Sequence, residues 1–195
     1  MSKQTKPQEM INDENIVELY WQRDQNAIQE TDKKYGRLIT RMKKQLTHPN
    51  RNQETALGGL LSDIMCESLG LDVMLLGSGS VRSTELGPIV LYSDLCECFP
   101  YDDASYMLQV TGAQFKRMIK YMVRDEVWEG VHNEFYQLSS GMRVVYDRAT
   151  HEFLKFDLKG KPVEDDKIYK IGLQQFHFNN LEDFFNISFD EISEN

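Results

Sequence analysis

The segment from Thr55 to Arg82 constrains the fold more than any other part of the sequence. Thr55 can cap a helix that ends at Gly70. The helix carries an apolar stripe of Leu57, Leu60, Leu61, Ile64, Met65 and Leu69. The apolar run at 72–76 follows, as expected of a strand buried on both faces, and leads into a glycine-containing loop at 77–82. This order is typical of α/β folds, which usually place ligands at the carboxyl ends of their strands.

Hydrophobic periodicity predicts the other elements. Residues 1–13 lack periodicity and are expected to be a leader, and residues 14–35 indicate one long amphipathic helix. Residues 106–110 indicate a strand that precedes an amphipathic helix at about 113–123. Four short strands are expected at 135–138, 142–146, 153–158 and 168–172. The predicted fold class is therefore α/β, bordering on α+β, with a mixed β-sheet flanked by helices.

Charge limits the partners that this chain can bind. The net charge is −9, and the acidic excess lies in residues 51–195. Since binding to nucleic acid or to an anionic membrane surface needs clustered cations, neither partner is expected. The cluster Lys116, Arg117, Lys120 and Arg124 could form an anion patch, but a solvated helix face is the favoured interpretation.

The sequence shows no obvious catalytic site, metal site or export signal. Cys96 and Cys98 have no second cysteine pair, and His48, His132, His151 and His177 fall at no spacing typical of zinc ligands. His132 beside Glu134 has the right chemistry for acid–base work, but such pairs arise easily by chance. The start of the chain lacks the apolar core of a signal peptide, and three cysteines favour a reducing compartment, which suggests the cytoplasm.

Six segments in order resemble the C-terminal domain of the 5′-nucleotidase family. They are residues 51–65, 77–82, 99–101, 110–112, 137–147 and 169–176, within a resemblance that spans about residues 37–185. The first has the family's pattern of Arg, Glu and Thr before an apolar helix. The second matches a glycine loop that ends in arginine, and the fifth matches a Gln-x-Ser-Gly-type strand ending in Tyr-Asp. One such match would be weak, whereas six in register indicate a common family.

The resemblance implies that two domains have separate roles, substrate recognition and catalysis. In that family this domain recognises the nucleotide, while a divalent metal pair and the catalytic residues belong to an N-terminal metallophosphatase domain joined to it by a long helix. Residues 14–36 would then be the linking helix, and residues 37–195 a recognition domain that stops early. No cofactor is expected in this chain, and an upstream signal peptide, if one has been removed, would place the protein outside the cytoplasm.

The family's ligand contacts can be carried over to matching positions. Arg51 and Arg82 correspond to the arginines that contact phosphate, and Gly79 lies in the loop whose N–H groups are exposed. Tyr101 and Phe176 correspond to the two rings that sandwich the base, and Glu182 to the acid that holds the ribose hydroxyls. The resemblance thus implies binding of a nucleoside monophosphate or a related small phosphoester.

Departures from the family pattern leave alternatives open. Gly77 replaces the loop asparagine, Ala56 replaces another asparagine, and residues 180–183 replace a Gly-Gly-Asp-Gly segment. Tyr101 and Phe176 could be ordinary packing aromatics, and Arg51 and Arg82 could form surface ion pairs. The rival function is accordingly a non-catalytic interaction module that has lost nucleotide recognition.

Overall fold

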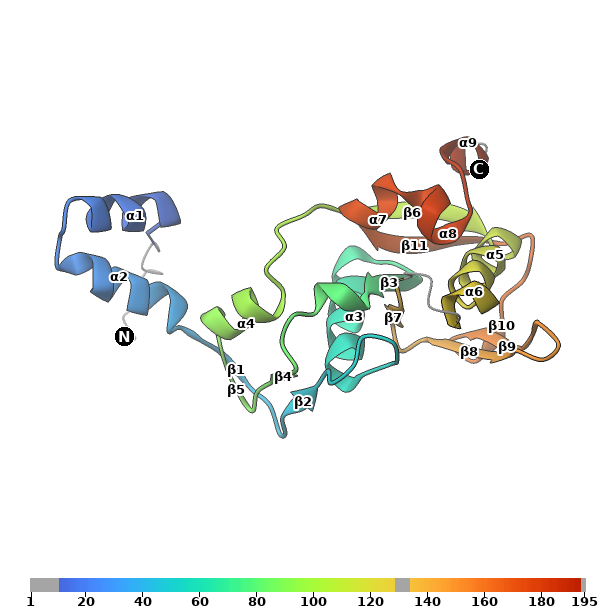
Figure 1. The fold of residues 1–195 in the computed structure, drawn as a ribbon, viewed down its shortest axis with the longest axis horizontal. Coiled ribbons are helices and arrows are strands. Elements are labelled where there is room, and N and C mark those ends of the chain that lie inside the picture. Colours follow the sequence, from blue (N-terminus) through green and yellow to red (C-terminus); the bar gives the residue numbers. More distant parts are fainter. Residues whose placement is uncertain (1–10, 129–133, 194–195) are drawn as a thin grey trace, which may run out of the picture.

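A four-stranded mixed sheet forms the centre of the protein (Figure 1). The computed structural model describes residues 11–128 and 134–193. The strand order is β6 (Ser105–Thr111), β11 (Ile168–Gln174), β3 (Val73–Gly77) and β7 (Tyr136–Leu138). β11 runs parallel to β3, while β6 and β7 pair antiparallel with their neighbours. The predicted mixed sheet with flanking helices is confirmed.

The continuous apolar run of β3 is explained by two cores, one on each face of the sheet. Val73 and Leu75 belong to a core that includes α5 (Gly112–Met122), whereas Met74 and Leu76 belong to a core that includes Leu57 of α3 (Ala56–Leu69). Successive side chains of a strand point to opposite faces, so a strand between two cores must be apolar throughout. All five residues of β3 are buried, as predicted.

The predicted boundaries of α3 are confirmed by its caps. The Thr55 hydroxyl accepts a hydrogen bond from the Gly58 N–H at 3.1 Å, and Gly70 ends the helix with φ = 64°. The buried Ser62 hydroxyl lies 3.1 Å from the carbonyl of Met74 and 3.0 Å from that of Gln137. The helix is therefore fixed against both β3 and β7.

The prediction of one long N-terminal helix is wrong. The chain forms two antiparallel helices, α1 (Asp13–Trp21) and α2 (Asn26–Tyr35), which lie at one end of the molecule (Figure 1). Arg23 has φ = 54°, which ends α1, and the Asp24 carboxylate accepts a hydrogen bond from the Asn26 N–H at 2.8 Å. The Tyr35 hydroxyl donates to the Asp13 carboxylate at 2.6 Å, which ties the ends of the hairpin together. Residues 1–10 of the predicted leader lie outside the described residues.

Two short strand pairs connect this hairpin to the body. β1 (Leu38–Arg41) pairs with β5 (Ile89–Leu91), and β2 (Leu46–Thr47) pairs with β4 (Glu85–Leu86). The other short elements are η1 (Ser78–Ser80), α4 (Tyr92–Cys98) and α6 (Asp125–Trp128). Among the described residues, no helix is both long and apolar enough to cross a membrane.

The last third of the chain contains the predicted strands and then three short helices. β8 (Met142–Asp147), β9 (Glu152–Leu158) and β10 (Lys161–Pro162) form an antiparallel sheet. The helices are α7 (Gln175–Asn179), α8 (Leu181–Phe185) and α9 (Phe189–Ser193). Residues 161–162 lie between two predicted strands and pair with the end of β9 as an additional short strand.

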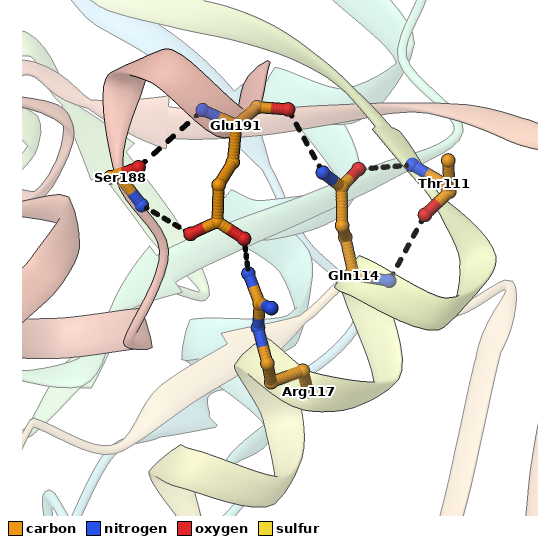
Figure 2. Close-up of polar contacts among 5 residues, drawn as sticks. All are labelled: Thr111, Gln114, Arg117, Ser188 and Glu191. Carbon is orange, nitrogen blue, oxygen red and sulfur yellow. Dashed lines mark hydrogen bonds and ion pairs between the residues drawn. The ribbon is translucent and has the colours of Figure 1, made fainter. Parts of the chain in front are cut away.

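The region around α9 is held against the beginning of α5, as Figure 2 shows. The Gln114 side-chain amide donates to the Glu191 carbonyl oxygen at 3.0 Å, and the Glu191 carboxylate forms an ion pair with Arg117. The hydrogen bond from the Ser188 N–H and the contact with Arg117 lower the pKa of Glu191. Lys116 is likewise paired, with Asp165 at 2.7 Å. These pairings support the solvated, ion-paired interpretation of this helix face.

Candidate functional site

A cavity of about 350 Å³ lies where the two parallel strands of the central sheet end. η1 follows β3 and α7 follows β11, so the two connections meet at the same edge of the sheet. The cavity is lined by Arg51, Gly79, Ser80, Arg82, Tyr101, Asp103, Glu134, Gln174, Phe176 and His177. Its volume falls within the range of sites for small molecules, roughly 300–1,000 Å³.

Five of the six predicted site residues line this one cavity, although they come from four separate stretches of the chain. They are Arg51, Gly79, Arg82, Tyr101 and Phe176. Glu182 lies exposed in the first turn of α8, outside the residues that line the cavity. Its contact with ribose hydroxyls stays a prediction that the cavity does not support, and the ligand contacts of the other five stay predictions as well.

Buried polar side chains hold the Arg51 loop beside the glycine loop. Gln137, which is 1% exposed, donates from its side-chain amide to the Gln53 carbonyl at 2.8 Å and to the Ser78 hydroxyl at 2.9 Å. The His48 ring lies 2.7 Å from the Thr55 hydroxyl and 3.1 Å from the Ser78 carbonyl. Burial lowers the pKa of His48, and the nearby Arg51 charge acts in the same direction.

Arg82 and Tyr101 form a second part of the cavity wall. The Arg82 guanidinium lies over the Tyr101 ring, 5.3 Å from its centroid, and donates a hydrogen bond to the Tyr101 hydroxyl. The backbone N–H of Arg82 donates to the Cys98 carbonyl at 2.8 Å, which anchors the end of the glycine loop on α4. The planar guanidinium is thus held in place by a ring, and no carboxylate of the described residues forms an ion pair with it.

Arg51 and Arg82 form no ion pair with any residue in the described part of the chain. The surface ion-pair interpretation therefore has no support. The Phe176 side chain is 59% exposed, far more than a core aromatic, and it makes no ring contact with Tyr101 in the described structure. Arg82 covers one face of the Tyr101 ring, whereas the Phe176 ring is largely exposed and offers surface on which a flat group could stack.

The cavity also contains two carboxylates, which make its electrostatics mixed. Asp103 and Glu134 line it together with the two arginines. The Gly79 N–H donates to the Glu134 carboxylate at 2.6 Å, so this loop donor is already used by the chain itself. The site can pair an anionic group with guanidinium and also accept hydrogen bonds from hydroxyl or amino groups.

His177 is a buried titratable group at the wall of the cavity. Its side chain is only 4% exposed, and its ring packs against those of Tyr136, Phe176 and Phe184. Burial lowers the pKa of His177 to about 4, so the imidazole is neutral at pH 7.

Sequence reasoning did not assign Ser80, Asp103, Glu134, Gln174 or His177 to this site. A signal existed for two of them, since Gln174 and His177 lie two and five residues beyond the predicted strand at 168–172. That signal becomes informative only once β11 is known to run parallel to β3. His132 of the dismissed acid–base pair lies outside the described residues. Among the residues that the structure does describe, no group of three or more His, Cys, Asp or Glu side chains could hold a metal ion.

The perturbed His177 predicts a pH dependence of stability. Its pKa is about 4 when folded and near 6.5 when unfolded, so the unfolded chain binds the proton more tightly. The neutral His177 ring makes its full contribution to the free energy of unfolding above about pH 6.5, and this contribution is lost as the pH falls towards 4. At pH 5 the loss should be about 2 kcal/mol. Urea unfolding of the wild type and of His177→Phe at pH 7 and pH 5 would measure this loss. The variant should lose about 2 kcal/mol less than the wild type; equal losses in both proteins would contradict the assignment.

Comparison with known proteins identifies the family. The 5′-nucleotidase, C-terminal domain family matches residues 31–187. The fold is similar to a 5′-nucleotidase precursor from Thermus thermophilus, with a TM-score of 0.63 and 19% identity over 78% of this chain and 32% of that one. It is also similar to the NAD nucleotidase of Haemophilus influenzae, with a TM-score of 0.67 and 14% identity over 90% of this chain and 34% of that one.

A putative 5′-nucleotidase from Staphylococcus aureus is also similar, with a TM-score of 0.58 and 14% identity over 89% of this chain and 36% of that one. No curated protein sequence matches the chain significantly. The chain spans about a third of the length of these solved structures. Because the family match covers most of the sequence, the chain belongs to the 5′-nucleotidase C-terminal domain family.

Proposed function

We propose that this chain is the recognition domain of a 5′-nucleotidase-type phosphoester hydrolase that takes part in nucleotide catabolism. It would hold a nucleoside monophosphate, or a related small phosphoester, while an N-terminal metallophosphatase domain with a divalent metal pair cleaves the phosphate. The chain alone would not be catalytic. The observation that carries the proposal is a single cavity lined by two guanidinium groups without ion-pair partners in the described chain and by two rings that do not touch each other.

The chemistry of these groups suits the parts of a nucleotide. Arg51 and Arg82 can donate charge-assisted hydrogen bonds to phosphate oxygens, each worth roughly 1.5–3 kcal/mol. Tyr101 and Phe176 can stack on a base, with about 1–3 kcal/mol per base. Together these contributions would support micromolar binding even in an open site.

Ligand binding is tested first by thermal unfolding. At about 100 times its dissociation constant, AMP should add about 2.7 kcal/mol to the stability of the folded state. For a chain of this size the melting temperature should rise by roughly 5–10 °C. If AMP, UMP and adenosine all leave the melting temperature unchanged at millimolar concentration, the nucleotide proposal fails.

Calorimetry on arginine variants separates phosphate recognition from base recognition. Arg82→Gln should weaken AMP binding at least tenfold, because a charge-assisted contact is lost, and should change adenosine binding little. Arg143, which is exposed on β8 and does not line the cavity, provides the control Arg143→Gln with unchanged AMP affinity. Equal effects of both substitutions would contradict a phosphate site at Arg82. Metal-dependent release of phosphate from AMP by the pure chain would contradict the absence of catalysis.

The second candidate is a non-catalytic interaction module that has lost nucleotide recognition. The position of Glu134 favours it, because this carboxylate adds negative charge to the cavity and takes the Gly79 N–H. On this alternative no nucleotide shifts the melting temperature.

A further inference from the structure

Two almost fully buried polar side chains that line the cavity carry nitrogen atoms without a hydrogen-bond partner among the described residues. Gln174 is 5% exposed and His177 is 4% exposed. Within the described residues the Gln174 amide nitrogen makes no hydrogen bond, and His177 makes none at either ring nitrogen. Of these nitrogens only His177 Nδ1 is fully buried. Gln174 Nε2 and His177 Nε2 keep some exposure, and as groups of two largely buried residues on a cavity wall they can donate to a ligand there.

The two side chains are neighbours in space. Gln174 is the last residue of β11 and immediately precedes α7, and His177 lies three residues further along, within α7. Gln174 is the N-cap of α7 with an extended backbone, and its side chain and that of His177 line the same cavity. The Ser80 hydroxyl donates to the Gln174 Oε1 atom at 2.9 Å, so the Nε2 amino group is the part of this amide left for a ligand.

The position of the proton on His177 follows from its burial. Because burial holds the pKa near 4, the ring is neutral at pH 7 and carries one N–H and one lone pair. Nδ1 is fully buried and has no partner in the described residues. A proton there would be an orphaned buried donor, which folded proteins avoid more strictly than an unpaired acceptor. The proton therefore belongs on Nε2, so the two residues that line the cavity supply two donors, the His177 Nε2–H and the Gln174 amino group.

We propose that Gln174 and His177 read the edge of the base and make the site selective for 6-oxopurine nucleotides, those of hypoxanthine or guanine, over adenine nucleotides. A 6-oxopurine presents O6 and N7 as adjacent acceptors, whereas adenine presents a donor, the N6 amino group, beside N7. Phe176, the ring expected to stack on the base, has its centroid 5.4 Å from that of His177. The stacking surface and the two donors are thus next to each other, and this inference rests on the proposed nucleotide function.

Calorimetric titration of the full chain with IMP and with AMP at pH 7 tests the selectivity, because these ligands differ only in the group at position 6 of the purine and in the proton that hypoxanthine carries on N1. The wild type should bind IMP about tenfold more tightly, which corresponds to about 1.4 kcal/mol. His177→Phe should bring the affinity ratio close to one, mainly by weakening IMP. Gln174→Met, which removes the amide but keeps the length of the side chain, should lower the ratio as well.

Control variants and outcomes separate this inference from the proposed function. His151→Asn removes an exposed histidine that does not line the cavity and should keep the wild-type ratio. If AMP binds as tightly as IMP while Arg82→Gln still weakens both, the selectivity inference is wrong and the nucleotide function stands. An unchanged ratio in a folded His177→Phe or Gln174→Met variant also overturns it. If neither nucleotide binds the wild type, both proposals fall.

Discussion

Replacing Phe115 with alanine should lower the free energy of unfolding by about 3–5 kcal/mol. The Phe115 side chain is fully buried in α5, and its ring packs edge-on against Phe156 with 5.1 Å between centroids. Alanine would remove the transfer free energy of a whole ring and leave a cavity in the larger of the two cores. Urea unfolding followed by circular dichroism measures the loss, with an unchanged m-value if the folded state keeps its compactness.

Phe176→Ala is the matched control, because it removes the same ring from a different environment. Phe176 is 59% exposed, so its removal should cost less than about 1 kcal/mol of stability. Its effect should appear in binding instead, as a loss of roughly 1–3 kcal/mol in nucleotide affinity. A loss of stability as large as that of Phe115→Ala would show that Phe176 is a packing residue and would remove the stacking interpretation.

The sequence predicted those parts of the fold whose causes are local. The α3 stripe, its Thr55 cap and Gly70 terminus, and the fully apolar β3 all appear as expected, because helix caps and hydrophobic periods act over a few residues. The break between α1 and α2 was missed because Ala27 and Ile28 follow Tyr20 and Trp21 by seven residues, so the helical spacing of apolar residues is kept across the polar segment 22–26. It depends on Arg23 adopting a left-handed conformation, which the hydrophobic period does not reveal.

The site was predictable only as far as the family motifs reached. The motifs supplied the five matched residues that line the cavity. Asp103 lies only two residues after the matched Tyr101, whereas Glu134 lies in none of the six matched segments. Assigning Gln174 and His177 to the site requires knowing that β11 lies parallel to β3. Nearly a hundred residues separate these two strands in the sequence, so no local pattern reveals their pairing. Glu182 was assigned to the site only because it occupies the place of the acid in the family's Gly-Gly-Asp-Gly segment. Residues 180–183 differ from that segment, and Glu182 does not line the cavity.

Gly77→Ala should cost about 3 kcal/mol, the upper part of the usual range for overpacking a tight core. The backbone conformation is not the obstacle, since Gly77 has φ = −55° and ψ = 122°, which alanine adopts readily. A Cβ atom at this position would lie 2.4 Å from Cε1 of His177, so the buried ring would have to move. The glycine that departs from the family pattern thus makes room for the imidazole at the wall of the cavity.

A double-mutant cycle with His177→Ala isolates this contact. Once the ring is absent, Gly77→Ala should cost little, so the two substitutions should couple by about 2 kcal/mol. Gly59→Ala is the control, because an added Cβ meets nothing within 4 Å and alanine is favoured in a helix by roughly 0.5–1 kcal/mol. It should leave stability unchanged or raise it. If the losses of stability from the two substitutions simply add, the His177 ring does not occupy the space beside Gly77. The position of His177 on which the proposed base recognition rests would then be wrong.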